Sequence, residues 1–377
     1  MAQGMTPHIT EIEIIESSHG SGVRIHTDVD VIGEYVFGGP RYVVYQMAEV
    51  AGQLVGKNPL ERERHWSELK RLLRKYDRLG LGPLDVALWD FAGKYQELPI
   101  CKLLGSFRQT IPAYASTPHG HEAGDGPLVT PADYADFAET CLDLGYPGFK
   151  LHTWDVEAGD RRDMDKEREL IQAVGERVGD EMDLMLDPAA DYQTFAEALD
   201  IGRVCDEYGF FWYEDPMRDA GLSHHAHRTL RQKLDTPLLQ TELVRGLENM
   251  TNFIEAEACD FVRANPLYDG GITGIMKRAH IAEGFGLDIE LHYSGPARRQ
   301  CLGAIRNTNY YEVGPAQPDR EKLGGASRSN IYACGYSDAI ADVRSDGTFA
   351  IPDGPGLGVS YDWDYIEDGE TNRLVFS

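Results

Sequence analysis

Basic residues are scarce in this sequence. Its 377 residues include 36 Lys and Arg against 62 Asp and Glu, which gives a formal net charge of −26 at neutral pH. Because a surface this negative repels phosphate backbones and anionic lipid headgroups, we expect neither nucleic-acid binding nor membrane binding. A small anion can still bind where local positive charge, most simply a metal ion, overrides the overall field.

Cysteine pairs, long apolar runs and nucleotide motifs are also missing. The six cysteines form no C-x-x-C pair, which argues against a zinc site or a disulfide framework and indicates a reducing compartment. No stretch approaches the roughly 18 apolar residues of a membrane span, and MAQGMTPHITEIEII does not resemble a secretory signal. The Gly-rich segments GPRYVV and DGGITG match no dinucleotide fingerprint. We therefore expect a cytoplasmic protein without a nucleotide cofactor.

The first hundred residues predict strands followed by helices. Alternating apolar and polar residues indicate the strands, and apolar residues at helical spacing indicate the helices. The expected strands are Ile9–Glu16, Val23–Thr27 and Val31–Phe37, and the expected helices span 43–56, 60–77 and 83–96. Strands and helices in separate blocks are typical of an α+β unit.

From about residue 110, short apolar runs recur, each ending in a polar residue and each followed by a helical stretch. After TIPAYAS (110–116), the polar residues that end the runs are Lys150, Asp187, Glu214, Glu242, Asn265, His292 and Glu312. Their spacing of roughly 20 to 37 residues suits one strand and one crossover helix per unit. Eight such units predict a (β/α)-barrel, in which the strand ends form one rim that carries the functional residues.

Three consecutive strands of this barrel end in the carboxylates Asp187, Glu214 and Glu242. Polar residues fall at strand ends by default because strands end at solvent, but three like charges at one rim repel one another strongly. A divalent cation between them removes this cost. Because oxygen ligands favour Mg²⁺ over softer metals, the sequence predicts a Mg²⁺ site.

Cationic and imidazole groups flank the expected metal site on two sides. Lys150 and His152 are two residues apart on one strand and so share a face, and His292 lies four strands further round. This set suits removal of the proton α to a carboxylate, with a neutral imidazole as the base. Lys150 would support the carboxylate electrostatically, and Glu312 would donate a hydrogen bond to it if kept protonated.

These residues, with further motifs, give a resemblance to the enolase superfamily, mandelate racemase-like branch. FKLH resembles the family's K-x-K strand, and the three carboxylates match its Mg²⁺ ligands in order and spacing. Three longer segments resemble its passage into the barrel, its turn after the sixth strand and its C-terminal return: 80–105, YDGGITG (268–274) and IPDGPGLGVSYD (351–362). The resemblance implies an α+β capping domain (1–105), a modified (β/α)7β barrel (106–345) and a C-terminal segment (346–377) that returns to the capping domain.

The sequence departs from the family pattern at three points. His152 replaces the second lysine of K-x-K, and Asn265 stands where the family has an Asp that pairs with the seventh-strand histidine, here His292. Without an anionic partner, we expect His292 to be neutral more often. The connection Ser17–Gly22 is shorter than the substrate-covering loop of relatives. Three outcomes stay open: a more open pocket, closure by the Gly-rich stretch 119–127, or completion by a neighbouring subunit.

The leading functional hypothesis is a Mg²⁺-dependent dehydratase of a sugar acid, either an aldonate or an aldarate, that yields a 2-keto-3-deoxy acid. His292 is expected to be one acid/base group and His152 the other, in either assignment; Lys150 supports them electrostatically, and Asn265 can orient His292. His119, Trp154 and Tyr293 follow strand ends and are expected to contact the small carboxylate substrate. The alternatives are a racemase or epimerase, a cycloisomerase, and a metal-binding relative without turnover. A homo-oligomer is expected because relatives commonly form one.

Overall fold

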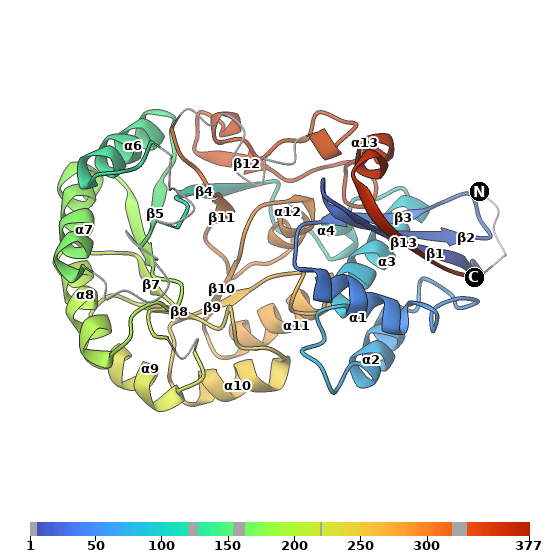
Figure 1. The fold of residues 1–377 in the computed structure, drawn as a ribbon, viewed down its shortest axis with the longest axis horizontal. Helices are drawn as coiled ribbons and strands as arrows, with labels where there is room; N and C mark the ends of the chain where they lie inside the picture. The colour runs from blue at the N-terminus through green and yellow to red at the C-terminus, as the bar shows by residue number, and fades with distance from the viewer. Residues whose placement is uncertain (1–5, 120–126, 154–162, 219–220, 319–329) are drawn as a thin grey trace.

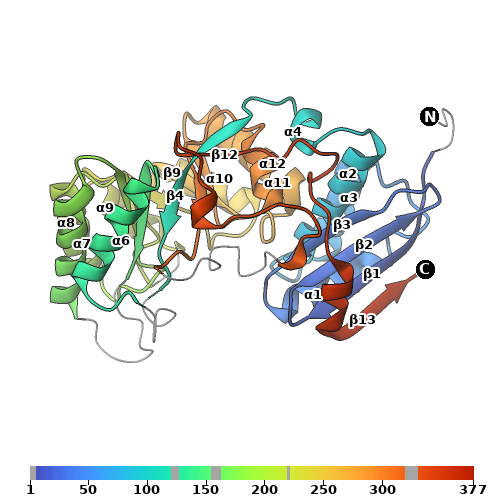
Figure 2. The ribbon, with the colours of Figure 1, turned by 90° about the horizontal axis from the view of Figure 1, so that it is seen from above.

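An antiparallel sheet contains the first strands of the chain, as their alternating sequence predicts. The computed structural model describes residues 6–119, 127–153, 163–218, 221–318 and 330–377. Strands β1 (Ile9–Ser17), β2 (Ser21–Thr27) and β3 (Gly33–Phe37) end within two residues of their expected limits. The last strand, β13 (Glu370–Phe376), pairs with β1, so that the order is β13-β1-β2-β3 and the two ends of the described chain meet in one sheet (Figure 2).

Helices pack against this sheet and connect it to the barrel. They are α1 (Arg41–Ala51), α2 (Arg62–Leu72), α3 (Leu81–Tyr95) and the short α4 (Ile100–Leu103). The first two end five residues earlier than predicted. The chain turns after each of them, at Gly52 in the first case. Helix α3 is buried almost all round because it packs against β3 on one side and the barrel helix α11 (Gly271–Gly284) on the other.

Eight parallel strands close into a barrel, which confirms the predicted fold class (Figure 1). They are β4 (Thr110–Ser116), β5 (Gly148–His152), β6 (Asp183–Asp187), β7 (Trp212–Glu214), β8 (Leu238–Gln240), β9 (Phe261–Ala264), β10 (Asp288–Leu291) and β11 (Tyr311–Val313). Pairing of β11 with β4 closes the ring. The strand ends that carry the singled-out polar residues therefore form one rim.

In the described residues, an α-helix follows each of the first seven barrel strands. Besides α11 these helices are α6 (Pro131–Asp143), α7 (Met164–Val178), α8 (Phe195–Glu207), α9 (His224–Arg231), α10 (Leu247–Glu255) and α12 (Pro296–Leu302). The described part of the connection from β11 to β12 (Thr348–Ala350), residues 314–318 and 330–347, contains no α-helix.

The C-terminal segment contacts both units of the molecule. Strand β12 pairs antiparallel with β4 of the barrel. After the short helix α13 (Trp363–Asp368), β13 reaches the first sheet (Figure 2). None of the helices in the described ranges combines the length and the apolar character needed to cross a membrane.

Candidate active site

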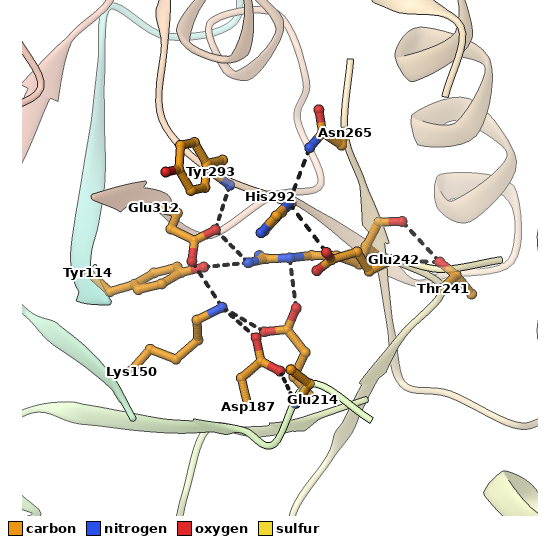
Figure 3. A network of polar contacts seen from close by, with 12 residues as sticks. Tyr114, Lys150, Asp187, Glu214, Thr241, Glu242, Asn265, His292, Tyr293 and Glu312 are labelled. Atoms are coloured by element: carbon orange, nitrogen blue, oxygen red, sulfur yellow. Dashed lines mark hydrogen bonds and ion pairs between the residues drawn. The ribbon is translucent and has the colours of Figure 1, made fainter. Parts of the chain in front are cut away.

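Three carboxylates from three neighbouring strands lie together at the barrel rim. Asp187 ends β6, Glu214 ends β7, and Glu242 follows the end of β8 by two residues (Figure 3). One oxygen from each lies within 4.8 Å of the other two. Because the three ligands are all carboxylate oxygens, the cluster forms a site suited to a divalent cation.

The backbone beside these carboxylates is held in unusual conformations. Asp215 has φ +33° and Thr241 has φ +87°, the left-handed region that non-glycine residues rarely adopt. The Thr241 hydroxyl donates to the Arg263 carbonyl at 3.0 Å and accepts the Arg263 N–H at 3.2 Å. These bonds stabilise a conformation that costs on the order of 1–3 kcal/mol and fix the direction in which Glu242 leaves its strand.

Lys150 is wholly buried among carboxylates. Its Nζ lies 3.0 Å from Asp187 Oδ2, 3.0 Å from Glu214 Oε2 and 2.9 Å from Glu312 Oε1. Burial alone would lower the pKa of Lys150, but Glu214 and Glu312 outweigh it and raise the pKa well above its ordinary value. Lys150 is therefore a positive charge that balances the carboxylates around it.

Arg263 on β9 is the second buried cation of the site. Its Nε lies 2.9 Å from Glu214, its Nη2 lies 2.7 Å from Glu312, and it also donates to the Tyr114 hydroxyl at 2.9 Å. Sequence reasoning missed Arg263, although its position two residues before Asn265 puts both on one face. No sequence feature assigned Tyr114 to the site, because it lies within β4 and aromatic residues are common in strands.

Glu312 on β11 is ionised, and an ionised carboxylate accepts hydrogen bonds but cannot donate one. Burial alone would raise the pKa of Glu312, but Lys150 and Arg263 hold it well below its ordinary value. Its Oε2 also accepts the Tyr293 N–H at 2.5 Å. The condition for Glu312 to donate a hydrogen bond, that it be kept protonated, is therefore not favoured by the two cations that surround it.

The charge balance of the cluster fits a bound dication. The four carboxylates, Asp187, Glu214, Glu242 and Glu312, face two cations among the described residues, Lys150 and Arg263. Burial, together with Glu214 and Asp187, raises the pKa of Glu242 to about 8. Without a cation one carboxylate of the cluster thus keeps a proton near neutral pH, and a dication can take the place of that proton.

His152 ends β5 with its ring at the edge of the carboxylate cluster. Its Nε2 lies 3.1 Å from Asp187 Oδ2, and its buried Nδ1 has no hydrogen-bond partner in the part of the chain that the structure describes. The ring of His119, which follows β4, lies 4.3 Å from the ring of His152. Trp154, which is expected from the sequence to contact the substrate, lies outside the described residues.

His292 follows β10 and is held by Asn265. The Asn265 Oδ1 accepts the Leu267 N–H at 2.9 Å and an Arg298 N–H at 2.8 Å. Both partners are donors only, so the amide cannot be reversed, and its Nδ2 faces His292 Nδ1 at 3.1 Å. Glu242 Oε1 lies further from the same nitrogen, at 3.4 Å, so the closer amide decides: Nδ1 accepts from Asn265, and the neutral ring carries its hydrogen on Nε2. Burial lowers the pKa of His292 to about 3, so the ring is neutral.

Two cavities meet at His292 and Tyr293. One, of about 250 Å³, is lined by His119, His152, Glu242 and Glu312, and the other, of about 290 Å³, extends to residues 35–39, the end of β3 and the two glycines that follow it. Tyr293 itself has φ +71°, and its ring lies 5.5 Å from that of His292. The described residues that line either cavity include none of Ser17–Gly22, and most of the stretch 119–127 lies outside the description.

Comparisons with known proteins agree with this architecture. A D-xylonate dehydratase of Haloferax volcanii is 26% identical over 93% of this chain and 86% of its own length. A D-galactarolactone cycloisomerase of Agrobacterium fabrum is 27% identical over 84% of this chain and 82% of its own. The crystal structure of D-glucarate dehydratase from Agrobacterium tumefaciens complexed with magnesium has a TM-score of 0.85 and 28% identity, covering 97% of this chain and 99% of that one.

Two family models match the two units of the fold. The model described as mandelate racemase / muconate lactonizing enzyme, N-terminal domain, matches residues 7–105, and the model described as enolase C-terminal domain-like matches residues 133–365. The second match alone covers more than half of the chain. With its capping sheet, its closed barrel and the carboxylate cluster at the rim, this chain belongs to the enolase superfamily, in the mandelate racemase-like branch.

Proposed function

We propose that this protein is a Mg²⁺-dependent dehydratase that converts a sugar acid, an aldonate or an aldarate, into a 2-keto-3-deoxy acid. The names of its relatives, D-xylonate dehydratase and D-glucarate dehydratase, support this reaction class. The all-carboxylate ligand set of Asp187, Glu214 and Glu242 supports Mg²⁺ as the cation. The partner of the protein is then a small carboxylate bound at the barrel rim.

The observation that carries the proposal is the fixed hydrogen on His292 Nε2. The amide of Asn265 donates to Nδ1, so Nε2 keeps its hydrogen and cannot accept a proton from the substrate. A racemase with two bases on opposite faces needs both to accept a proton. One accepting imidazole and one donating imidazole instead suit an elimination, in which a proton leaves one carbon and an oxygen leaves the next.

His152 is the imidazole that is free to accept. Asp187 Oδ2, 3.1 Å from Nε2, accepts the Nε2 hydrogen, so the neutral ring has its lone pair on Nδ1, which no described residue holds. Lys150 acts through its charge: its Nζ lies within 3.0 Å of Asp187, Glu214 and Glu312, and these carboxylates favour its protonated form. Its charge attracts the substrate carboxylate and stabilises the negative charge that develops there.

In the proposed elimination, His152 moves the proton and His292 donates a hydrogen bond to the leaving oxygen. His152 takes the C2 proton as the C–H electron pair forms the enediolate. The C3–O bond breaks, protonated His152 returns the proton to the departing hydroxide, and His292 Nε2–H donates a hydrogen bond to the same oxygen. Water and an enol result, and the enol tautomerises to the keto acid. A dication held by Asp187, Glu214 and Glu242 would add positive charge beside the substrate carboxylate.

The test is incubation of purified protein and Mg²⁺ with a library of aldonates and aldarates, followed by an assay for 2-keto acids. We expect keto acid from at least one member and none after a chelator is added. A similarity to a D-galactarolactone cycloisomerase makes a lactone-forming or lactone-opening isomerase the second candidate. Exchange of solvent deuterium into Cα without loss of water, from any substrate, would contradict the dehydratase and favour an isomerase.

A further inference from the structure

Among the described residues, one buried arginine near the active site has no carboxylate as its counter-charge. Four arginines of the described residues are less than 9% exposed, and three of them pair with carboxylates: Arg263 with Glu214 and Glu312, Arg278 with Asp269, and Arg299 with Asp338. Arg298, which is 8% exposed, has no carboxylate within ion-pair distance in the described chain. An isolated buried charge is costly, so a buried guanidinium without a partner is a site at which an anion would be stabilised.

The hydrogen bonds of Arg298 go to neutral oxygens. Its Nε donates to the His292 carbonyl at 3.1 Å, Nη1 to the Tyr35 hydroxyl at 3.4 Å, and Nη2 to Asn265 Oδ1 at 2.8 Å. Of its five N–H groups, two have no partner among the residues of known placement, one on Nη1 and one on Nη2. The Tyr35 hydroxyl accepts from Arg298 and so keeps its own hydrogen to donate.

These donors line the cavity of about 290 Å³ that adjoins the reaction site. His292 and Tyr293 belong to the walls of both cavities, so a substrate that begins at the carboxylate cluster can extend past them toward Arg298. Asp338 also lines this cavity, but its Oδ1 accepts hydrogen bonds from Arg299, Tyr311 and Tyr336. The charge of Asp338 is therefore already balanced by Arg299.

We propose that Arg298 and the Tyr35 hydroxyl bind a second carboxylate at the far end of the substrate, so that the enzyme prefers aldarates over aldonates. This inference rests on the proposed sugar-acid function and deepens it by choosing between its two substrate classes. A planar guanidinium matches the two oxygens of a carboxylate, and the bonds formed are charge-assisted. An aldonate ends in a neutral hydroxyl and would leave the Arg298 charge uncompensated.

The first experiment compares matched pairs that differ only at the distal carbon, such as an aldonate and the aldarate of the same configuration. We expect kcat/KM to be about 10- to 100-fold higher for the aldarate, the range that a charged hydrogen-bonded group contributes. Turnover of aldonates with equal or higher kcat/KM than the matched aldarates would overturn the proposal and leave the dehydratase function intact.

The second experiment measures how variants change the ratio of kcat/KM for aldarate to that for aldonate. Arg298→Lys keeps the positive charge but loses the planar guanidinium, and Tyr35→Phe removes one hydroxyl. Each variant should therefore lower the ratio severalfold or more. Arg306→Lys, on the exposed surface, is the matched control and should leave the ratio unchanged. If Arg298 has only a structural role, Arg298→Lys should lower kcat/KM by the same factor for both substrates. A ratio that is unchanged in both variants would contradict the subsite. If Arg298→Lys does not fold, Tyr35→Phe still decides.

Binding separates failure of this inference from failure of the proposed function. If no sugar acid is turned over, calorimetry with Mg²⁺ present still compares the affinities of the matched diacid and monoacid. Tighter binding of the diacid that Arg298→Lys or Tyr35→Phe abolishes would support the subsite in a protein with other chemistry. Equal affinities would overturn it.

Discussion

A single amide decides what His292 can do. The family pattern has a carboxylate beside this histidine, which would take a hydrogen from Nδ1 and leave Nε2 bare. Here Arg298 and the Leu267 N–H both donate to Asn265 Oδ1, so that the amide nitrogen faces the ring. The substitution therefore does more than remove a charge: it reverses the direction of the hydrogen bond.

Asn265→Asp should reverse that hydrogen bond. The new carboxylate would accept a hydrogen from His292 Nδ1, leave Nε2 bare and raise the pKa of the ring, because an adjacent anion stabilises the imidazolium. Nitrogen-15 NMR of labelled histidines reports which ring nitrogen carries the hydrogen. Exchange of the Cα proton with deuterium should then accompany or replace elimination. Asn249→Asp, on the exposed side of α10, is the control, and a Nδ1–H signal for His292 in the unmodified protein would refute the assignment.

Metal binding should release a proton. Burial, with Glu214 and Asp187, raises the pKa of Glu242 to about 8, so that below this pH the cation must displace a proton. Mg²⁺ affinity should therefore rise with pH up to about 8 and level off above it. Calorimetry at pH 7 in buffers of different ionisation enthalpy measures the proton count. Glu242→Gln should lose both the release and most of the affinity, and a binding heat independent of the buffer would contradict this prediction.

At the scale of elements, the sequence predicted site residues at the ends of strands better than site residues on the helices that connect the strands. Asp187 and Glu214 end strands, and the period-2 rule that linked Lys150 with His152 also links Arg263 with Asn265. Arg298 was not predictable, because it comes from α12 and its place depends on how that helix meets β3.

The residue pattern alone did not predict which distant strands pair; only the family resemblance implied that the C-terminal segment returns to the capping domain. Strand β12 pairs with β4 and β13 pairs with β1, and no local pattern in either pair of segments identifies its partner. Helix ends were predicted late for α1 and α2 because apolar spacing continues into the turns that follow them. Local periodicity thus identifies elements, and burial against distant elements decides where they end.

The contact between α3 and α11 should carry a pH-dependent stability. Burial, opposed by Thr273 hydrogen bonds, raises the pKa of Asp85 to about 7, and the Thr273 N–H donates to Asp85 Oδ2 at 2.9 Å. The unfolded chain loses this proton near pH 4. The contribution of Asp85 to stability is therefore complete below about pH 4 and decreases until about pH 7.

Asp85→Asn tests this element-scale prediction because it keeps the neutral form at every pH. The free energy of unfolding of the variant, relative to the unmodified protein, should rise between pH 4 and pH 7 by up to about 4 kcal/mol and then stay constant. Denaturant titrations at several pH values measure the difference. Asp180→Asn, at an exposed turn, is the control. A difference that does not change with pH would show that Asp85 ionises normally in the folded protein.

At the scale of the whole molecule, the formal charge of −26 and the isoelectric point near 4.8 should make stability depend on salt. Many carboxylates on one surface repel one another, and ions at about 0.15 M already shorten the range of this repulsion to roughly 8 Å. Salt also weakens exposed ion pairs, but each such pair contributes only about 0–1 kcal/mol. We therefore expect Tm at pH 7.5 to rise as NaCl increases from low concentration toward about 1 M.

The control for this prediction is pH rather than a variant. Near pH 5 the net charge approaches zero, so the self-repulsion disappears and the remaining effect of salt on Tm should shrink or change sign. NaCl is used instead of MgCl2 because Mg²⁺ would also stabilise the folded state by binding the carboxylate cluster. Thermal scans at both pH values give the slope of Tm against NaCl concentration at each pH. A Tm that falls with NaCl at pH 7.5 would mean that specific ion pairs outweigh the repulsion, and equal slopes at both pH values would assign the effect to burial of apolar surface instead.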